Sequence, residues 1–249
     1  MRDFTGKRVI VTGGSRGIGY AAADAFVQAG ARVLITGRSA ETLAAAADKL
    51  GNGTAFLEWD MTDVYAIPEK LEQAVRLLGG LDVLICNAGV LERPGGDRNA
   101  ANDFFRVSPE DWDYIMNVNL RSVFFLCQAA ANRWIARGEG GHIVNVCSNM
   151  GFRMVSTAPY GIGKWGVRGM TLGLGQLLAR QGIIVNAVSP GPVTTQMMGW
   201  KEGDENVHPH IPIGRYSTPE EVAETVLFLA GSETVVGEAL VADGGERLY

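Results

Sequence analysis

The sequence predicts an α/β fold in which a doubly wound parallel sheet of about seven strands carries helices on both faces. The apolar segments are short and continuous, which is typical of strands buried on both faces. They alternate with helical segments, as in successive βαβ units. No repeat, low-complexity tract or linker interrupts the 249 residues. That length suits one α/β domain, so we expect a single domain over residues 1–249.

The elements follow from apolar runs, capping residues and glycine stops. We expect strands at 8–12, 31–36, 54–59, 81–86, 142–146, 183–188 and 239–242. Helices are expected at 20–29, 40–50, after Thr62, at 110–137, from before Tyr160 to about Gln181, and from Thr218 to about Ala230. Ser39, Ser108 and Thr218 are good N-caps, and Thr62 is a candidate cap for the helix that follows it. Pro stands at the first helical position after Ser108 and after Thr218. An Asn in the interior of helix 110–137 is mildly unfavourable and needs an explanation.

Composition excludes several classes of function. A net charge of −5 gives no electrostatic support for nucleic-acid binding. No apolar run is long enough to span a membrane, and the amino-terminal residues lack a secretory signal, so we expect a cytoplasmic protein. The cysteines Cys86, Cys127 and Cys147 lie inside apolar segments without disulfide or zinc spacing. The three histidines form no metal-binding spacing, and we predict no metal site.

A glycine-rich turn joins the first strand to the first helix. It runs from Gly13 through Ser15, Arg16, Gly17 and Ile18 to Gly19. Glycines at such a turn let the backbone approach a pyrophosphate, and the helix that follows offers free N–H groups to it. The spacing, Gly-x-x-x-Gly-x-Gly, is a weak signal alone. Between a strand and a helix it indicates a nucleotide-binding, Rossmann-type unit.

The end of the second strand favours NADP over NAD. An acidic residue there would bind the ribose hydroxyls of NAD. The chain instead has Arg38, and Arg16 in the glycine turn is a second candidate cation. A guanidinium matches a 2′-phosphate with its planar set of donors. The alternative is that both arginines are solvated surface residues.

A tyrosine and a lysine stand four residues apart in the helix after the fifth strand. Helical spacing puts Tyr160 and Lys164 on one face. Ser148 follows the fifth strand and lies 12 residues before Tyr160. Alone, such a pair is common and carries little information. After a glycine-rich nucleotide turn, it indicates an acid/base site.

Four motifs in order resemble those of the short-chain dehydrogenase/reductase family. They are residues 12–19, Asn87-Ala88-Gly89, Ser148 with Tyr160 and Lys164, and residues 190–195. The resemblance covers residues 7–245, and it is nearest to members similar to 3-oxoacyl-carrier-protein reductases and to sugar-acid or polyol oxidoreductases. It implies hydride transfer between NADP(H) and a secondary alcohol or ketone. It also implies a homodimer or homotetramer, since family members pair the helices near 110–137 and 157–181.

The resemblance assigns roles to individual residues. It implies that Tyr160 is the general acid/base, that Ser148 orients the substrate oxygen and that Asn119, rather than Asn117, belongs to a proton relay through water. A Lys164 ammonium about 4 Å from the phenol would lower the Tyr160 pKa by about 3 units at an effective dielectric constant of about 20. The cofactor would contact Gly13, Ser15, Arg16, Gly17, Ile18, Gly19, Arg38, Asp60, Met61, Asn87, Ala88, Gly89, Tyr160, Lys164, Pro190, Gly191, Val193 and Thr195.

Several positions depart from the family pattern. The interval from Ser148 to Tyr160 is one residue short, which leaves Cys147 as an alternative to Ser148. Gly161 and Gly163 interrupt the catalytic helix at about 1 kcal/mol each, and close approach of the cofactor or a helix would explain them. Loop 90–108 and lid 196–214 are expected to shape the substrate pocket. Arginines that could bind an anionic substrate there are Arg93, Arg98, Arg106 and Arg153.

Two other functions remain open from the sequence. A catalytically silent NADP(H)-binding sensor or scaffold would use the same fold. A sugar-nucleotide epimerase or dehydratase would need a larger carboxyl-terminal substrate region than the one after Thr195.

Overall fold

One parallel sheet organises the chain. The computed structural model describes residues 2–152 and 157–248. Its strand order, β3-β2-β1-β4-β5-β6-β7, confirms the predicted fold class. The strands are β1 Arg8–Thr12, β2 Arg32–Gly37, β3 Ala55–Glu58, β4 Val83–Cys86, β5 Gly141–Val146, β6 Ile183–Pro190 and β7 Ala239–Ala242. The order reverses between β1 and β4, and ligands of open α/β sheets bind at such a switch point.

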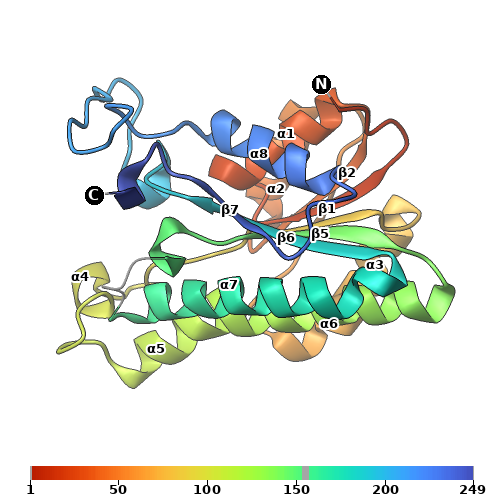
Figure 1. Cartoon of the computed structure of the whole chain (residues 1–249), viewed down its shortest axis with the longest axis horizontal. Helices are drawn as coiled ribbons and strands as arrows, with labels where there is room; N and C mark the ends of the chain where they lie inside the picture. Colours follow the sequence, from red (N-terminus) through yellow and green to blue (C-terminus); the bar gives the residue numbers. More distant parts are fainter. Residues whose placement is uncertain (1, 153–156, 249) are drawn as a thin grey trace.

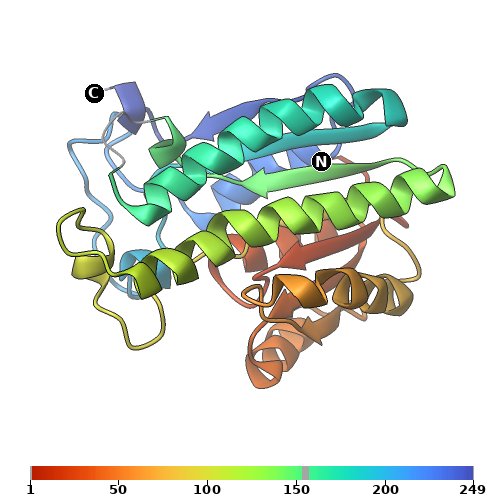
Figure 2. The same ribbon diagram turned by 90° about the horizontal axis from the view of Figure 1, so that it is seen from below.

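Helices cover both faces of the sheet (Figure 1). One face carries α1 Gly17–Gln28, α2 Ala40–Leu50 and α8 Pro219–Ala230. The other carries α3 Ile67–Leu78, α6 Ser122–Arg137 and α7 Pro159–Leu178, and Figure 2 shows α6 and α7 side by side across it. Successive residues of β1 point to opposite faces. Val9 and Val11 therefore enter the core under α1 and α8, whereas Ile10 enters the core under α3 and α6.

The predicted helix starts are mostly confirmed. Ser39 caps α2 by accepting a 3.3 Å hydrogen bond from Thr42 N. Thr218 caps α8 and forms a reciprocal capping box with Glu221, and Ser108 caps α5 Pro109–Met116. The predicted cap at Thr62 is wrong: Asp63 accepts from two main-chain N–H groups and starts the short helix η1 Val64–Ala66, which leads into α3. A carboxylate is the stronger acceptor there.

The prediction of a helix over 110–137 is confirmed, because helical residues run from Pro109 to Arg137 without a break. The sequence did not indicate the π-helical turn η2, Asn117–Arg121, which lies between α5 and α6. Such turns change the main-chain pairing and often occur at functional sites. Here the turn carries Asn119, which is completely buried. The unfavourable Asn of the sequence thus marks a local change of helix type.

Two irregular segments lie beyond the carboxyl ends of the strands. Segment 90–108 contains only the short helix α4 Arg98–Ala101, and segment 196–214 contains the 3-10 helix η5 Gln196–Met198. The Arg98 guanidinium joins them by donating a 2.9 Å hydrogen bond to the Met197 carbonyl. These two segments form one end of the molecule, on the left in Figure 1.

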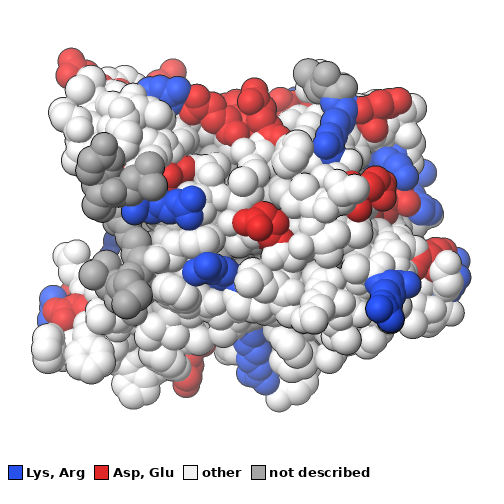
Figure 3. All heavy atoms as spheres, in the orientation of Figure 1, with Lys and Arg blue, Asp and Glu red and all other residues white. Residues whose placement is uncertain are grey.

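The surface carries charges of both signs. On the face shown in Figure 3, groups of Lys and Arg and groups of Asp and Glu are separated by uncharged surface. Within the described part of the chain, no helix has both the length and the apolar character needed to cross a bilayer.

Candidate functional site

The switch point joins the glycine turn to the end of β4 through side-chain hydrogen bonds. Asn87 Nδ2 donates to the carbonyls of Thr12 and Gly13, at 2.9 and 3.0 Å. Thr12 Oγ1 accepts from the N–H groups of Asn87 and Ala88, at 2.9 and 3.1 Å. The Asn87-Ala88-Gly89 motif therefore fixes the glycine turn rather than only lining it.

The glycine turn has the form that a pyrophosphate site requires. Gly13 and Gly17 have φ angles of 66° and 55°, a region that L side chains rarely adopt. A Cβ on Gly19 would lie within 2.2 Å of the Gly13 carbonyl oxygen. No side chain caps the amino end of α1 at Arg16, so its first N–H groups point toward the end of the sheet. These features fit a dinucleotide phosphate at this helix start, with Ser15 and Ile18 in the same turn.

Ser148, Tyr160 and Lys164 come together beyond β5. Ser148 is buried and its side chain hydrogen-bonds the Tyr160 phenol. Lys164 is only 4% exposed, and its Nζ donates a 2.7 Å hydrogen bond to the Val146 carbonyl. Its Nζ also lies 5.6 Å from the centre of the Tyr160 ring. Cys147, the alternative to Ser148, points elsewhere and bonds the Lys164 carbonyl through Sγ at 3.2 Å.

The expected lowering of the Tyr160 pKa is absent from this structure. Burial raises the pKa of Tyr160 to about 12, because desolvation disfavours the phenolate more than the Ser148 hydrogen bond favours it. Burial also lowers the pKa of Lys164. The lysine ammonium is held by Val146, so it does not offset the desolvation of the phenol as we expected from spacing alone.

Asn119 is linked to the site through the main chain. Its Oδ1 accepts from Val90 N at 3.0 Å and its Nδ2 donates to the Val90 carbonyl at 2.8 Å. A Cβ on Gly89 would lie 2.9 Å from Asn119 Oδ1 and 3.8 Å from Lys164 Nζ. Gly89 therefore lets Asn119 and Lys164 approach each other. Asn117, the alternative, instead pairs with Arg121 at 3.2 Å.

The predicted adenosine end of the site contains an unexpected partner. Arg38 is exposed just after β2, and its Nη1 donates a 2.7 Å hydrogen bond to the Tyr114 hydroxyl from α5. Asp60 is exposed beyond β3, whereas the Met61 side chain is 5% exposed and packs in the core. Because its side chain is in the core, Met61 can contact an adenine only through its main chain. No sequence signal indicated Tyr114.

The segment after β6 returns to the glycine turn. Val193 is buried and pairs with Ser217 in an isolated bridge, and Thr195 Cγ2 would lie 3.4 Å from a Cβ on Gly17. Pro190 is buried at the end of β6, and Gly191 lies against Asp243, where a Cβ would come within 2.7 Å. Arg16 Nη1 reaches Gln196 Oε1 at 3.0 Å. The structure thus brings residues 190–195 beside the glycine turn.

The arginines considered for anionic substrates are already paired. Arg93, Arg98 and Arg106 form ion pairs with Asp111, Glu92 and Asp97, at 2.8, 2.7 and 3.0 Å. Such pairs lower the attraction of each guanidinium for a further anion. Arg153 lies outside the described residues.

The catalytic helix has room at one of its two unusual glycines. A Cβ on Gly163 would meet Asn119 Cβ and Met116 Sδ at 3.6 Å, which is ordinary van der Waals contact. Packing against the neighbouring helix therefore does not require glycine at position 163. Gly161 is buried in the same helix. Gly175, farther along α7, is the tight position, since its Cβ would lie 2.4 Å from Gly237 Cα.

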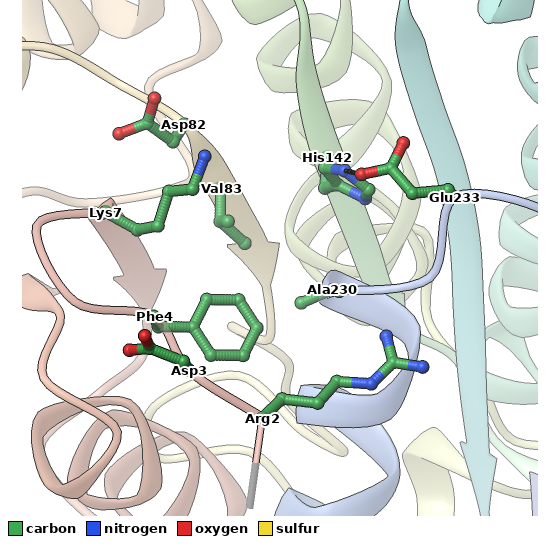
Figure 4. A pocket seen from close by; sticks show the side chains of 10 residues that line it. Arg2, Asp3, Phe4, Lys7, Asp82, Val83, His142, Ala230 and Glu233 are labelled. Atoms are coloured by element: carbon green, nitrogen blue, oxygen red, sulfur yellow. Dashed lines mark ion pairs between the residues drawn. The ribbon is translucent and has the colours of Figure 1, made fainter.

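A separate cavity of about 300 Å³ lies at the other end of the sheet (Figure 4). His142, the second residue of β5, faces Glu233 there, with Nε2 4.0 Å from Oε1. Burial lowers the pKa of His142, and its Nδ1 has no hydrogen-bond partner among the described residues. The candidate active site occupies the carboxyl ends of the strands and is distinct from this cavity.

Known proteins are similar to this chain over nearly their whole length. The short chain dehydrogenase family model matches residues 7–206. The 3-oxoacyl-[acyl-carrier-protein] reductase of Aquifex aeolicus is 34% identical, over 96% of this chain and 97% of that protein. The gluconate 5-dehydrogenase of Gluconobacter oxydans is 36% identical, over 98% and 95% of the two chains.

Solved structures agree. The crystal structure of a putative gluconate dehydrogenase from Agrobacterium tumefaciens has a TM-score of 0.87 and 30% identity, covering 99% of this chain and 98% of its own. A short-chain type dehydrogenase/reductase from Mycobacterium marinum has a TM-score of 0.85, 32% identity and coverage of 98% and 96%. With this fold, these motifs and this extent of similarity, the chain belongs to the short-chain dehydrogenase/reductase family of oxidoreductases, which act on CH–OH or C=O groups with a nicotinamide cofactor.

Proposed function

We propose that the protein transfers hydride between NADP(H) and a secondary alcohol or ketone, with Tyr160 as the general acid/base. The observation that carries this proposal is the convergence of Ser148, Tyr160 and the buried Lys164 beyond β5. A buried ammonium beside a buried phenol is costly unless it has a role. We also propose that residues 1–249 act as one dinucleotide-binding and catalytic domain, because the segments after β1, β4, β5 and β6 all contribute residues to the site.

Each residue has a defined chemical task in this proposal. The nicotinamide supplies or accepts the hydride when the cofactor is bound. Tyr160 gives a proton to the carbonyl oxygen during reduction, or takes it from the hydroxyl during oxidation. Ser148 donates a hydrogen bond to the same oxygen and orients it. Lys164 stabilises the tyrosinate form by its charge once it is freed to face the phenol.

Proton supply is proposed to run through Lys164 and the main chain at Asn119. Both polar ends of the Asn119 side chain are used by Val90, so the amide is not available as a relay group. The π-helical turn changes main-chain pairing at this position. A water held by a main-chain carbonyl of this turn would therefore link Lys164 to solvent.

Arg38 supports NADP as the cofactor. It is exposed at the end of β2, where no carboxylate follows the strand to bind ribose hydroxyls. Arg38→Asp is expected to weaken NADPH binding much more than NADH binding, measured by cofactor fluorescence. Equal losses would remove the proposed phosphate contact.

The catalytic proposal is tested with Tyr160→Phe. The variant is expected to bind NADPH as the native protein does and to lose turnover by at least about 100-fold, since general acid/base catalysis contributes 10²–10⁴. Substrates for this assay come from a panel of 3-oxoacyl thioesters, sugar acids and polyols, the first two being suggested by the names of the relatives. Full activity in Tyr160→Phe would refute the mechanism. Tight NADPH binding without turnover of any panel member would support a silent sensor instead.

We also propose a homodimer or homotetramer that pairs the α6 and α7 face. This face exposes Phe124, Trp165 and Leu172, and a groove of about 660 Å³ runs between the two helices. Apolar helix faces of this kind commonly mark protein interfaces. Phe124→Glu is expected to lower the mass in light scattering, and a native monomer would contradict the proposal.

A further inference from the structure

Three segments that are distant in the sequence meet at the proposed adenosine end of the site. Arg38 follows β2, Asp60 follows β3 and Tyr114 lies on α5. Arg38 Nη1 donates to the Tyr114 hydroxyl at 2.7 Å, and the charge of Asp60 acts on the same phenol. Tyr114 therefore contacts Arg38, the residue proposed to bind the 2′-phosphate of the cofactor.

The hydrogen-bond balance of Tyr114 leaves one donor unused. Its oxygen accepts a hydrogen bond from Arg38, so its own O–H must point to another group. The hydrogen bonds of the described residues include no acceptor for that O–H. Burial and Asp60 raise the pKa of Tyr114, which keeps the hydroxyl protonated at neutral pH. A neutral donor thus stands directly beside a fixed guanidinium.

We propose that Tyr114 and Arg38 form one recognition pair for the 2′-phosphate of NADP(H). Tyr114 fixes the Arg38 guanidinium by accepting its hydrogen bond, and it offers its own O–H to a phosphate oxygen. This inference rests on the proposed use of NADP(H) and adds a residue that determines the choice of cofactor.

The chemistry favours a phosphate over a ribose hydroxyl. The pair presents a cation and additional N–H and O–H donors, which match the several acceptor oxygens of a dianion. An unpaired arginine on an exposed strand end would lose side-chain entropy on binding. The bond to Tyr114 fixes the guanidinium in advance, so less of this entropy is lost when the ligand binds.

The test measures binding of NADP⁺ and NAD⁺ by calorimetry without substrate, since these ligands differ only by the 2′-phosphate. Tyr114→Phe is expected to raise the Kd for NADP⁺ about tenfold, the usual effect of removing a hydrogen bond to a charged group. The Kd for NAD⁺ should remain within about twofold, which also shows that the variant is folded. Tyr65→Phe is the matched control, because Tyr65 is 86% exposed and its hydroxyl makes no hydrogen bond to any of the described residues.

A double-mutant cycle tests whether the two residues act as a pair. In the Arg38→Gln background, Tyr114→Phe is expected to change the NADP⁺ Kd by much less than in the native protein. Additive effects would overturn the pair. An unchanged NADP⁺ affinity in Tyr114→Phe, or equal losses for NADP⁺ and NAD⁺, would overturn the role of Tyr114.

The outcomes separate this inference from the cofactor proposal beneath it. If Arg38→Gln weakens the binding of NADP⁺ but not of NAD⁺, and Tyr114→Phe changes neither, the role of Tyr114 is refuted and the NADP preference stands. If Arg38→Gln weakens the binding of both cofactors equally, the proposed NADP preference itself is refuted.

Discussion

The side-chain amide of Asn119 makes both of its hydrogen bonds to one residue, Val90. Donor and acceptor distances are 2.8 and 3.0 Å, and Asn119 is completely buried. The amide satisfies both main-chain hydrogen-bonding groups of Val90, as the main chain of a neighbouring strand would. It therefore connects the π-helical turn to the loop that begins the substrate segment.

Asn119→Ala is expected to destabilise the protein by about 2–4 kcal/mol, because two partly buried main-chain groups at Val90 lose their hydrogen-bond partners. Urea denaturation measures this change. Asn117→Ala is the control, since Asn117 pairs only with the exposed Arg121, and it should change stability by no more than about 0.5 kcal/mol. Similar losses in both variants would show that the Val90 contacts are not what Asn119 contributes.

The glycines of α7 should respond in opposite directions to alanine. Gly163→Ala places a Cβ 3.6 Å from its nearest neighbours and should stabilise the protein by about 0.5–1 kcal/mol, because alanine loses less entropy in a helix. Gly175→Ala places a Cβ 2.4 Å from the Gly237 main chain and should destabilise it by about 1–3 kcal/mol. Thermal unfolding of the two variants checks the difference. If Gly163→Ala instead lowers the unfolding temperature, the contacts of the added Cβ do not determine the effect of this substitution.

The free protein should keep Tyr160 protonated far into the alkaline range. Burial raises its folded pKa to about 12, above the ordinary value of about 10. A raised folded pKa contributes stability that is present below pH about 10 and is lost as pH rises through about 12. The difference in ultraviolet absorbance between the native protein and Tyr160→Phe follows this titration. A phenolate that forms near neutral pH without cofactor would contradict the desolvation seen here.

The sequence was sufficient where local chemistry decides the structure. Continuous apolar runs located the seven strands, and the caps Ser39 and Thr218 located two helix starts, because capping depends on residues three positions apart. Helical spacing predicted that Tyr160 and Lys164 share one face of α7, and the family resemblance added Ser148.

The sequence was insufficient where distant residues decide. Asn119, in the π-helical turn, finds its hydrogen-bond partner at Val90, 29 positions away. The Tyr160 pKa depends on burial and on Val146 holding the Lys164 ammonium, neither of which spacing reveals. Tyr114 meets Arg38 across 76 positions and belongs to no motif. Each case concerns a long-range contact rather than a local preference.

His142 should make the protein sensitive to mild acid. Burial lowers its pKa below the ordinary value of about 6.5, so the folded state binds fewer protons than the unfolded state. This stability is fully present above pH about 6.5 and is lost as pH falls below it toward the folded pKa. His142→Gln, which does not titrate, is expected to reduce the loss of stability between pH 7 and 5, roughly the range spanning an ordinary histidine pKa.

Urea unfolding at several pH values measures this effect. His210→Gln is the control, since His210 is exposed in the segment after η5 and far from the amino ends of the strands. A buried imidazole that becomes charged beside Arg2 and Lys7 is disfavoured further, and Glu233 offsets this only in part because it is 86% exposed. If His142→Gln and the native protein lose stability in parallel below pH 6.5, the acid sensitivity has another source, and the lowered pKa of His142 does not govern it.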